Sequence, residues 1–270
     1  MKVKGKVILV TGGGSGIGRA LVLNLLSRGA SVATIDINQA GLDETVQLAG
    51  EAKDRLSTYV VDITDLSAVE ALPEKIIAQH GVIDGLINNA GIIQPFVRVK
   101  DLSFDAIQRV MNVNFFGTVN MTKTFLPYLL ERPEAHILNM SSMGSYAPVP
   151  GQTIYGAAKA AVKLFTEGLN SELMDTNVRV TVIFQGSTNT NIAKNSGITS
   201  IPGVDEEEVA ASFKVMQPAE AAIKIIDAME NDKYQATVGS DASTMFFLSR
   251  LAPKFAAKTI FNQMRYLLPS

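Results

Sequence analysis

The sequence predicts one doubly wound α/β domain, in which helices cover both faces of a parallel β-sheet of about seven strands. Short runs of apolar residues recur along the chain, and longer segments with helical periodicity fill most of the gaps between them. No linker rich in proline, glycine or serine divides the 270 residues. Strands that are apolar on both faces are typical of a parallel sheet buried between two layers of helices.

Six buried strands are expected, in chain order, at residues 7–10, 31–35, 58–61, 85–87, 136–140 and 179–184. A seventh, at 236–239, is expected at an edge of the sheet, so we assign residues 1–241 to the α/β domain. Within this domain, residues 187–217 hold several Asn, Gly and Pro residues and an acidic run, which predicts a loop with short helices above the carboxyl edge of the sheet. We interpret this segment as a substrate lid, with a plain surface loop as the alternative.

The composition excludes several classes of function. A formal net charge of -2 gives no overall basic field, so nucleic acid is not expected as a partner. The lack of cysteine excludes disulfides and Cys-based zinc sites, and the two histidines, His80 and His136, lack metal-ligand spacing, so no metal is expected. The N-terminal segment has no signal-peptide layout, and no apolar run reaches the roughly 18–20 residues of a membrane span. We therefore expect a cytoplasmic protein.

A glycine-rich turn joins the first strand to a helix. It reads TGGGSGIG at 11–18, and the residues placed to contact a ligand are Gly12, Ser15, Gly16, Ile17 and Gly18. Glycines let backbone N–H groups approach a pyrophosphate closely, and the positive N-terminus of the helix stabilises its charge. The turn therefore predicts a dinucleotide site, with a purely structural turn as the alternative.

The second strand is followed by Asp36, twenty residues beyond Gly16. A carboxylate here can accept hydrogen bonds from the adenosine ribose hydroxyls, and it would repel a 2′-phosphate. Neither Ser15 nor the two residues after Asp36, Ile37 and Asn38, supplies a cation. The pattern favours NAD over NADP, and a simple strand-end cap is the alternative interpretation of Asp36.

Two further strand ends carry candidate cofactor contacts. After the third strand, Asp62 could accept a hydrogen bond from the adenine amino group, with assistance from the Ile63 backbone. The fourth strand ends in NNAG, which contributes Asn89, Ala90 and Gly91. Ligands gather at the carboxyl ends of such strands, but NNAG could equally be stabilising turn chemistry.

Tyr155 and Lys159 lie four positions apart, on one face of an expected helix. A free tyrosine has a pKa near 10, so a nearby cation must stabilise its phenolate before it can act as a base at neutral pH. Lys159 can do so, and an oxidised nicotinamide would add to the effect. The pair predicts hydride-transfer chemistry, and a helix-surface pair is the alternative.

Taken together, the motifs resemble the short-chain dehydrogenases/reductases, in their single-domain Rossmann-fold form, over about residues 6–239. The resemblance rests on TGGGSGIG at 11–18, NNAG at 88–91, the Asn of NVNFFG at 112–117, Ser142, and YGAAK at 155–159. It implies a homodimer or homotetramer and a catalytic tetrad of Asn114, Ser142, Tyr155 and Lys159.

In this tetrad, Ser142 would hold the substrate oxygen, Tyr155 would move its proton, and Asn114 would connect Lys159 to solvent through a water. Ser141 is the neighbouring alternative to Ser142, and only one of them can serve because adjacent strand residues point to opposite faces.

After the sixth strand the chain departs from the family pattern, because Gln185 stands where the family usually has proline. Glutamine lacks the fixed φ of proline and adds hydrogen-bond donors beside the expected nicotinamide. Gly186 and Thr190 remain, and Thr190 is expected to contact the carboxamide or a phosphate.

The expected substrate site contains Ser142, Met143, Gln152 and Tyr155. Its candidate walls, at 94–97, 143–146 and 148–152, are mostly apolar, which favours a lipophilic secondary alcohol or ketone, such as a steroid-like or long-chain compound. A 3-oxoacyl thioester reductase using NADPH and a non-catalytic NAD-binding sensor or scaffold are the other hypotheses.

Residues 242–270 form a basic, amphipathic C-terminal extension without an acidic residue. Arg250, Lys254 and Lys258 recur four positions apart and share a helix face, a pattern compatible with an anionic membrane surface. Packing on the domain or on a partner subunit is the alternative.

Overall fold

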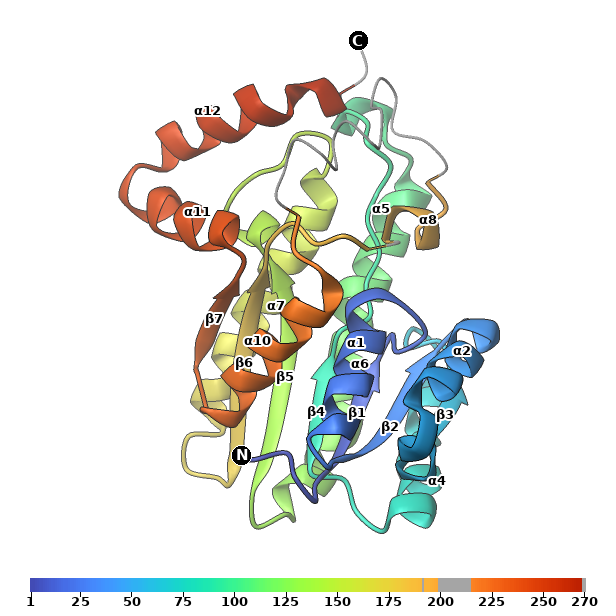
Figure 1. Cartoon of the computed structure of the whole chain (residues 1–270). Helices are drawn as coiled ribbons and strands as arrows, with labels where there is room; N and C mark the ends of the chain where they lie inside the picture. Colours follow the sequence, from blue (N-terminus) through green and yellow to red (C-terminus); the bar gives the residue numbers. More distant parts are fainter. Residues whose placement is uncertain (191, 199–214, 269–270) are drawn as a thin grey trace.

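The computed structural model describes residues 1–190, 192–198 and 215–268, and it contains a parallel seven-stranded sheet in the order β3-β2-β1-β4-β5-β6-β7 (Figure 1). The doubly wound α/β prediction is confirmed. The strands are β1 (Val7–Thr11), β2 (Ser31–Asp36), β3 (Leu56–Val60), β4 (Gly85–Asn88), β5 (Ala135–Ser142), β6 (Val178–Gln185) and β7 (Gln235–Val238).

The central strands lie close to their expected positions because their apolar runs are buried on both faces. All residues of β1 and β4 are buried, and β5 is buried except at its last residue. The largest displacement is in β3, which begins two residues before the expected position and ends at Val60. Asp62 therefore lies in the loop beyond the strand.

Helices form a layer on each face of the sheet. α1 (Gly16–Ser27) and α10 (Pro218–Glu230) pack together on one face, against Ile8, Leu138 and Ile183 of the strands. α4 (Leu72–His80), α6 (Gly117–Leu130) and α7 (Thr153–Glu172) cover the other face, against Leu9, Ile137 and Val180. The remaining α-helices in the described residues are α2 (Gln39–Ala49), α3 (Leu66–Glu70), α5 (Phe104–Met111), α8 (Ile192–Asn195), α11 (Ser240–Leu251) and α12 (Pro253–Met264).

The strand order reverses between β1 and β4, which lie side by side at the centre of the sheet. The chain leaves β1 toward β2 and leaves β4 toward β5, so the loops that follow these strands diverge at the carboxyl edge. Ligands bind in the crevice at such a switch point. The glycine turn after β1 and the NNAG segment after β4 therefore flank the same opening.

Residues 104–130 are helical throughout, but the type of helix changes along this segment. α5 ends at Met111, a π-helical turn spans Asn112–Phe116, and α6 begins at Gly117. A π turn inserts one extra residue into a helix and is frequent at functional sites. Its position matters here because Asn114 lies within it.

The C-terminal extension forms α11 and α12, which follow β7 at the carboxyl edge of the sheet (Figure 1). Their inner residues Met245, Ala256 and Ile260 form a small core with Ala147. Their outer residues include the exposed side chains Phe247, Leu251 and Phe255. The extension thus packs on the domain by one face only.

Within the described residues, the structure contains no helix that is both long enough and apolar enough to span a membrane. The predicted lid, 187–217, falls partly outside the described residues, and its described parts are 187–190, 192–198 and 215–217.

Candidate active site

The turn after β1 requires glycine at specific positions. Gly12 has a φ of +75° and Gly16 a φ of +52°, a region that side chains disfavour. A Cβ at Gly18 would stand 1.9 Å from the Gly12 carbonyl oxygen. Ser15, at the start of α1, makes no side-chain cap to the helix. The first N–H groups of α1 therefore remain free to bind an anion, beside backbone that glycine keeps uncovered.

Asp36 ends β2 and points toward this turn. Its Oδ2 accepts a hydrogen bond from Gly14 N at 2.9 Å, and its Oδ1 accepts one from Asn38 N at 3.0 Å. The carboxylate is thus held beside the glycines. The guanidinium of Arg19 also reaches Gly14, through its carbonyl oxygen, but it is paired with Glu44 at 2.6 Å.

The two residues predicted to meet adenine, Asp62 and Ile63, lie in the loop after β3. Asp62 Oδ1 accepts hydrogen bonds from Thr64 N and Thr64 Oγ1, each at 2.8 Å. Ile63 is buried, and its carbonyl oxygen accepts a hydrogen bond from Asn120 Nδ2 at 3.0 Å. Asp62 Oδ1 therefore stabilises the loop to which it belongs, whereas Asp62 Oδ2 makes no hydrogen bond within that loop.

Thr11 joins the two central strands at the opening. Its Oγ1 accepts hydrogen bonds from Asn89 N and Ala90 N, both at 2.9 Å, and its carbonyl oxygen accepts one from Asn89 Nδ2 at 3.0 Å. Asn89 and Ala90 therefore fix the NNAG segment to the end of β1. This role of Thr11 was not predicted from the sequence, although the residue is the first of the glycine motif.

Asn114 in the π turn holds the chain that follows NNAG. Its Oδ1 accepts a hydrogen bond from Ile92 N at 2.9 Å, and its Nδ2 donates to Ile92 O at 2.8 Å. A Cβ at Gly91 would stand 2.8 Å from Asn114 Oδ1 and 3.3 Å from Lys159 Nζ. Gly91 thus allows the predicted catalytic Asn and Lys to approach one another.

The structure separates the two serines at the end of β5. Ser141 is buried, and its Oγ donates a hydrogen bond to the carbonyl oxygen of Lys159 at 2.9 Å. Ser142 Oγ accepts a hydrogen bond from Gly144 N at 3.1 Å, and a Cβ at Gly144 would stand 3.6 Å from both Ser142 Oγ and Tyr155 Cε1. Ser142, and not Ser141, therefore lies beside Tyr155.

Tyr155 and Lys159 lie on α7 with the lysine Nζ 6.0 Å from the centre of the tyrosine ring. Lys159 Nζ donates a hydrogen bond to Met140 O at 2.9 Å. Burial lowers the pKa of Lys159 to about 8. Burial also raises the pKa of Tyr155, and the neighbouring Ser142 hydroxyl opposes this effect. The phenol is therefore neutral at pH 7, poised to donate a proton.

These observations fit a dinucleotide such as NAD or NADP. The glycine turn leaves no room for a side chain at Gly18. Ser15 does not cap the first N–H groups of α1, and the Asp36 carboxylate lies beside this turn. The Ser142, Tyr155 and Lys159 side chains converge at the other side of the same crevice. A model of the short chain dehydrogenase family matches residues 6–200.

The chain belongs to this family. It is an NAD(P)-dependent oxidoreductase that acts on CH–OH groups. It is 35% identical over 254 residues to SadH of Mycobacterium tuberculosis, a protein named as an oxidoreductase, with 92% of this chain and 91% of SadH covered. It is 38% identical over 188 residues to a 3-oxoacyl-[acyl-carrier-protein] reductase of Thermotoga maritima, with 69% and 75% covered.

Among solved structures, the fold is similar to a short-chain dehydrogenase/reductase from Burkholderia phymatum in complex with NAD. The TM-score is 0.83 at 23% identity, with 94% of this chain and 96% of that chain covered. Structures of similar proteins have been described with NAD and with NADP.

In this short-chain dehydrogenase, side chains replace proline in holding the turn after β6. Gln185 is buried, and its Nε2 donates a hydrogen bond to Thr188 Oγ1 at 2.6 Å. Asp241 Oδ2 accepts a hydrogen bond from Ser187 N at 2.8 Å. A Cβ at Gly186 would stand 2.2 Å from Asp241 Oδ1, so a larger residue at this position would displace the Asp241 carboxylate.

The described part of the predicted lid crosses the opening of the dehydrogenase. Thr190 lies over the glycine turn, where a Cβ at Gly16 would be 3.5 Å from its side chain. Asn195 Nδ2 donates a hydrogen bond to Ser15 Oγ at 2.9 Å, and Ser196 Oγ accepts one from Ile93 N at 2.9 Å. These contacts connect the segment to both sides of the crevice.

The expected substrate walls are only partly as the sequence suggested. Met143 packs against the core made with α11 and α12. Tyr146 also turns away, because its hydroxyl donates a hydrogen bond to Ala242 O at 2.8 Å and its ring packs on Phe246. Gln94 is fully buried and contacts the start of α7 instead of lining a wall.

Gln152 is also buried. Its Nε2 donates a hydrogen bond to Gln94 O at 2.7 Å, and its Oε1 has no partner in the described structure. This oxygen is a free acceptor three residues before Tyr155.

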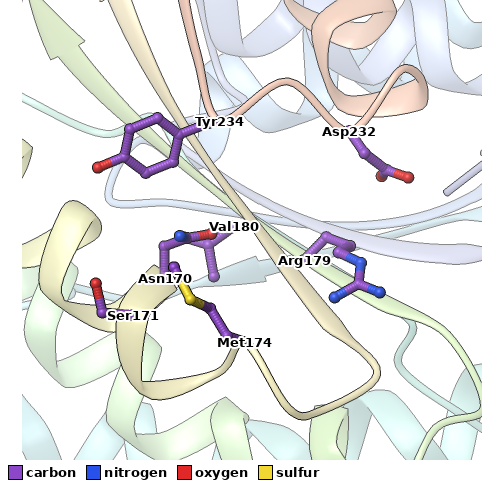
Figure 2. A pocket seen from close by; sticks show the side chains of 7 residues that line it. All are labelled: Asn170, Ser171, Met174, Arg179, Val180, Asp232 and Tyr234. Carbon is purple, nitrogen blue, oxygen red and sulfur yellow. The ribbon is translucent and has the colours of Figure 1, made fainter.

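A separate cavity of about 300 Å³ lies at the far end of α7 (Figure 2). Figure 2 shows that it is lined by Asn170, Ser171, Met174, Arg179, Val180, Asp232 and Tyr234. At a rise of 1.5 Å per residue, Asn170 lies roughly 20 Å along α7 from Tyr155. This cavity is therefore not the catalytic site.

Proposed function

We propose that the protein oxidises a lipophilic secondary alcohol, or reduces the corresponding ketone, with NAD as its cofactor. The observation that carries this proposal is the convergence of Ser142, Tyr155 and Lys159 beside the glycine turn, at the switch point of the sheet. Bound NAD would supply the hydride acceptor. Gly12, Gly16, Gly18 and Asp36 would hold its pyrophosphate and ribose.

In this proposal, Ser142 Oγ binds the oxygen of the alcohol, and Tyr155 takes the hydroxyl proton after its phenol has ionised to the phenolate, while the hydride of the alcohol carbon would pass to the bound NAD. The charge of Lys159 lowers the cost of forming the phenolate, which burial otherwise raises. Asn114 holds Ile92 and Gly91 against Lys159, so that the loop after β4 keeps its place beside the site. In ketone reduction, the neutral phenol returns the proton.

A 3-oxoacyl thioester reductase using NADPH is the second candidate, favoured by the similarity to the Thermotoga maritima reductase. One assay tests both candidates and the third hypothesis of a non-catalytic sensor. Secondary alcohols graded from short and polar to long and steroidal are offered with NAD or NADP, and 3-oxoacyl thioesters are offered with NADH or NADPH. We expect turnover with NAD and the apolar alcohols. Turnover of thioesters with NADPH alone, or NAD binding without any turnover, would contradict the proposal.

Two exposed apolar surfaces support proposals about assembly. Phe104, Phe116 and Leu164, on α5, the π turn and α7, are 87%, 50% and 68% exposed, and we propose that they form a homodimer or homotetramer interface.

Phe247, Leu251 and Phe255, at the junction of α11 and α12, are 66%, 85% and 62% exposed. Because the exposed cations Arg250, Lys254 and Lys258 flank them, we propose that this second surface contacts an anionic membrane.

The substitutions Leu164→Glu and Leu251→Glu separate the two surfaces, and each serves as the control for the other. We expect Leu164→Glu to lower the oligomeric mass in sedimentation equilibrium without changing vesicle binding. Leu251→Glu should instead lower co-sedimentation with phosphatidylserine-containing vesicles, while the oligomeric mass stays the same. If Leu251→Glu lowers the mass, the C-terminal surface is a subunit interface and not a membrane contact.

A further inference from the structure

A buried amide ties the loop after β4 to the first turn of α7. The side chain of Gln94 is fully buried, and its Oε1 accepts hydrogen bonds from Ile154 N at 2.7 Å and from Tyr155 N at 3.1 Å. Its Nε2 donates to Gly151 O at 2.8 Å. The main chain of Gln94 takes part as well, because its carbonyl oxygen accepts a hydrogen bond from Gln152 Nε2 at 2.7 Å.

These contacts supply a cap that the helix itself lacks. The first N–H groups of an α-helix have no partner inside the helix, and a side chain just before the helix usually accepts from them. Gln152 occupies that place in α7 and makes no such bond. Gln94 supplies the acceptor from 60 and 61 positions earlier in the chain. The position of the first turn of α7 therefore depends on the loop after β4.

That loop is itself fixed at consecutive residues. Asn114 bonds to both the N–H and the carbonyl oxygen of Ile92, and Ser196 Oγ accepts from Ile93 N. Gln94 is the next residue, and its side chain accepts a hydrogen bond from the backbone N–H of Tyr155. Ile92, Ile93 and Gln94 are thus each held by hydrogen bonds, and those of Gln94 connect this loop to the backbone of Tyr155.

We propose that Gln94 is a positioning residue, which holds the phenol of Tyr155 in register with Ser142 and Lys159 by capping the first turn of α7. The proposal rests on the function proposed above. Without the acceptor, two partly buried N–H groups lose their partner and the first turn of α7 can open. The phenol would then move, and a displacement of about 1 Å can cost on the order of 100-fold in rate.

Two substitutions of similar size test the role. Gln94→Met removes both the acceptor and the donor, whereas Gln94→Glu, as the neutral acid that burial favours, keeps an oxygen for Ile154 N and Tyr155 N and an O–H for Gly151 O. We expect Gln94→Met to lower kcat by about 10- to 100-fold, with the Kd for NADH within about twofold of wild type. Gln94→Glu should restore most of kcat.

The matched control is Ser103→Ala, which removes the exposed cap of α5, where Ser103 Oγ accepts from Ala106 N. This variant should lower the thermal midpoint, while kcat stays at the wild-type value. If Gln94→Met keeps the wild-type kcat, or if Gln94→Glu rescues nothing, Gln94 does not position Tyr155.

A measurement without substrate separates this inference from the proposed function. Hydrogen exchange at the amides of Ile154 and Tyr155 should be faster in Gln94→Met than in wild type, and slow again in Gln94→Glu. Unchanged exchange would overturn the inference whether or not the protein turns over alcohols. If exchange is faster in Gln94→Met but the wild type turns over none of the substrates, the cap is supported and the proposed reaction is contradicted instead.

Discussion

Replacing Tyr155 by phenylalanine should lower kcat for alcohol oxidation by about 1,000-fold or more, because general acid–base catalysis contributes roughly 100- to 10,000-fold. The substitution removes a single oxygen from a half-buried side chain. Ser142 would keep its hydrogen bond from Gly144 N, and Lys159 would keep its bond to Met140 O. The Kd for NADH, measured by fluorescence titration, should stay within about twofold of wild type.

Tyr146→Phe is a matched control for this experiment. Tyr146 is also half-buried, and its hydroxyl donates to Ala242 O, away from the catalytic side chains. Loss of this hydrogen bond should lower the free energy of unfolding by about 1 kcal/mol, with kcat unchanged. If Tyr155→Phe retained more than about a tenth of wild-type kcat, another group would be the proton carrier.

Replacing Asp36 by serine should reverse or abolish the preference for NAD. The wild-type carboxylate lies against Gly14 N, where a 2′-phosphate would meet its negative charge. We expect the ratio of kcat/KM for NAD over NADP to fall by about 100-fold, which corresponds to about 2.7 kcal/mol. Steady-state kinetics with both cofactors at the same ionic strength measure this ratio.

Asp43→Ser controls for the change in net charge. Asp43 lies on α2 and accepts a hydrogen bond from Gln39 Nε2 at 2.7 Å, outside the glycine turn. Its replacement should leave the cofactor ratio as in wild type. A wild type that prefers NADP would contradict the proposal, and Arg19 beside Gly14 would then be the first residue to test as a phosphate contact.

The sequence predicted those parts of the fold that depend on local pattern. The central strands were recognised from their apolar runs, because a strand that is buried on both faces is apolar at successive positions, and this pattern can be seen in the sequence without knowledge of its neighbours. The glycine turn was recognised because its shape excludes other residues, as the clash at Gly18 illustrates. Tyr155 and Lys159 were paired because one helical turn separates them.

The rest depended on contacts between distant segments. Gln94 was expected in a substrate wall, because nothing near it in the sequence indicates the helix that it caps. Tyr146 was misplaced for the same reason, since its partners Phe246 and Ala242 belong to the C-terminal extension. The choice between Ser141 and Ser142 needed the contacts of the two side chains at the end of β5.

The π turn at Asn112–Phe116 also sets a limit on how this chain can vary in length. Each residue advances an α-helix by about 100°, so deleting one residue here would convert the turn to regular helix and rotate α5 against α6. Asn114 would then face a different direction from Ile92 and Gly91. The π turn therefore lets α5 and α6 pack against different neighbours. The Asn114 side chain between them keeps its orientation toward the crevice.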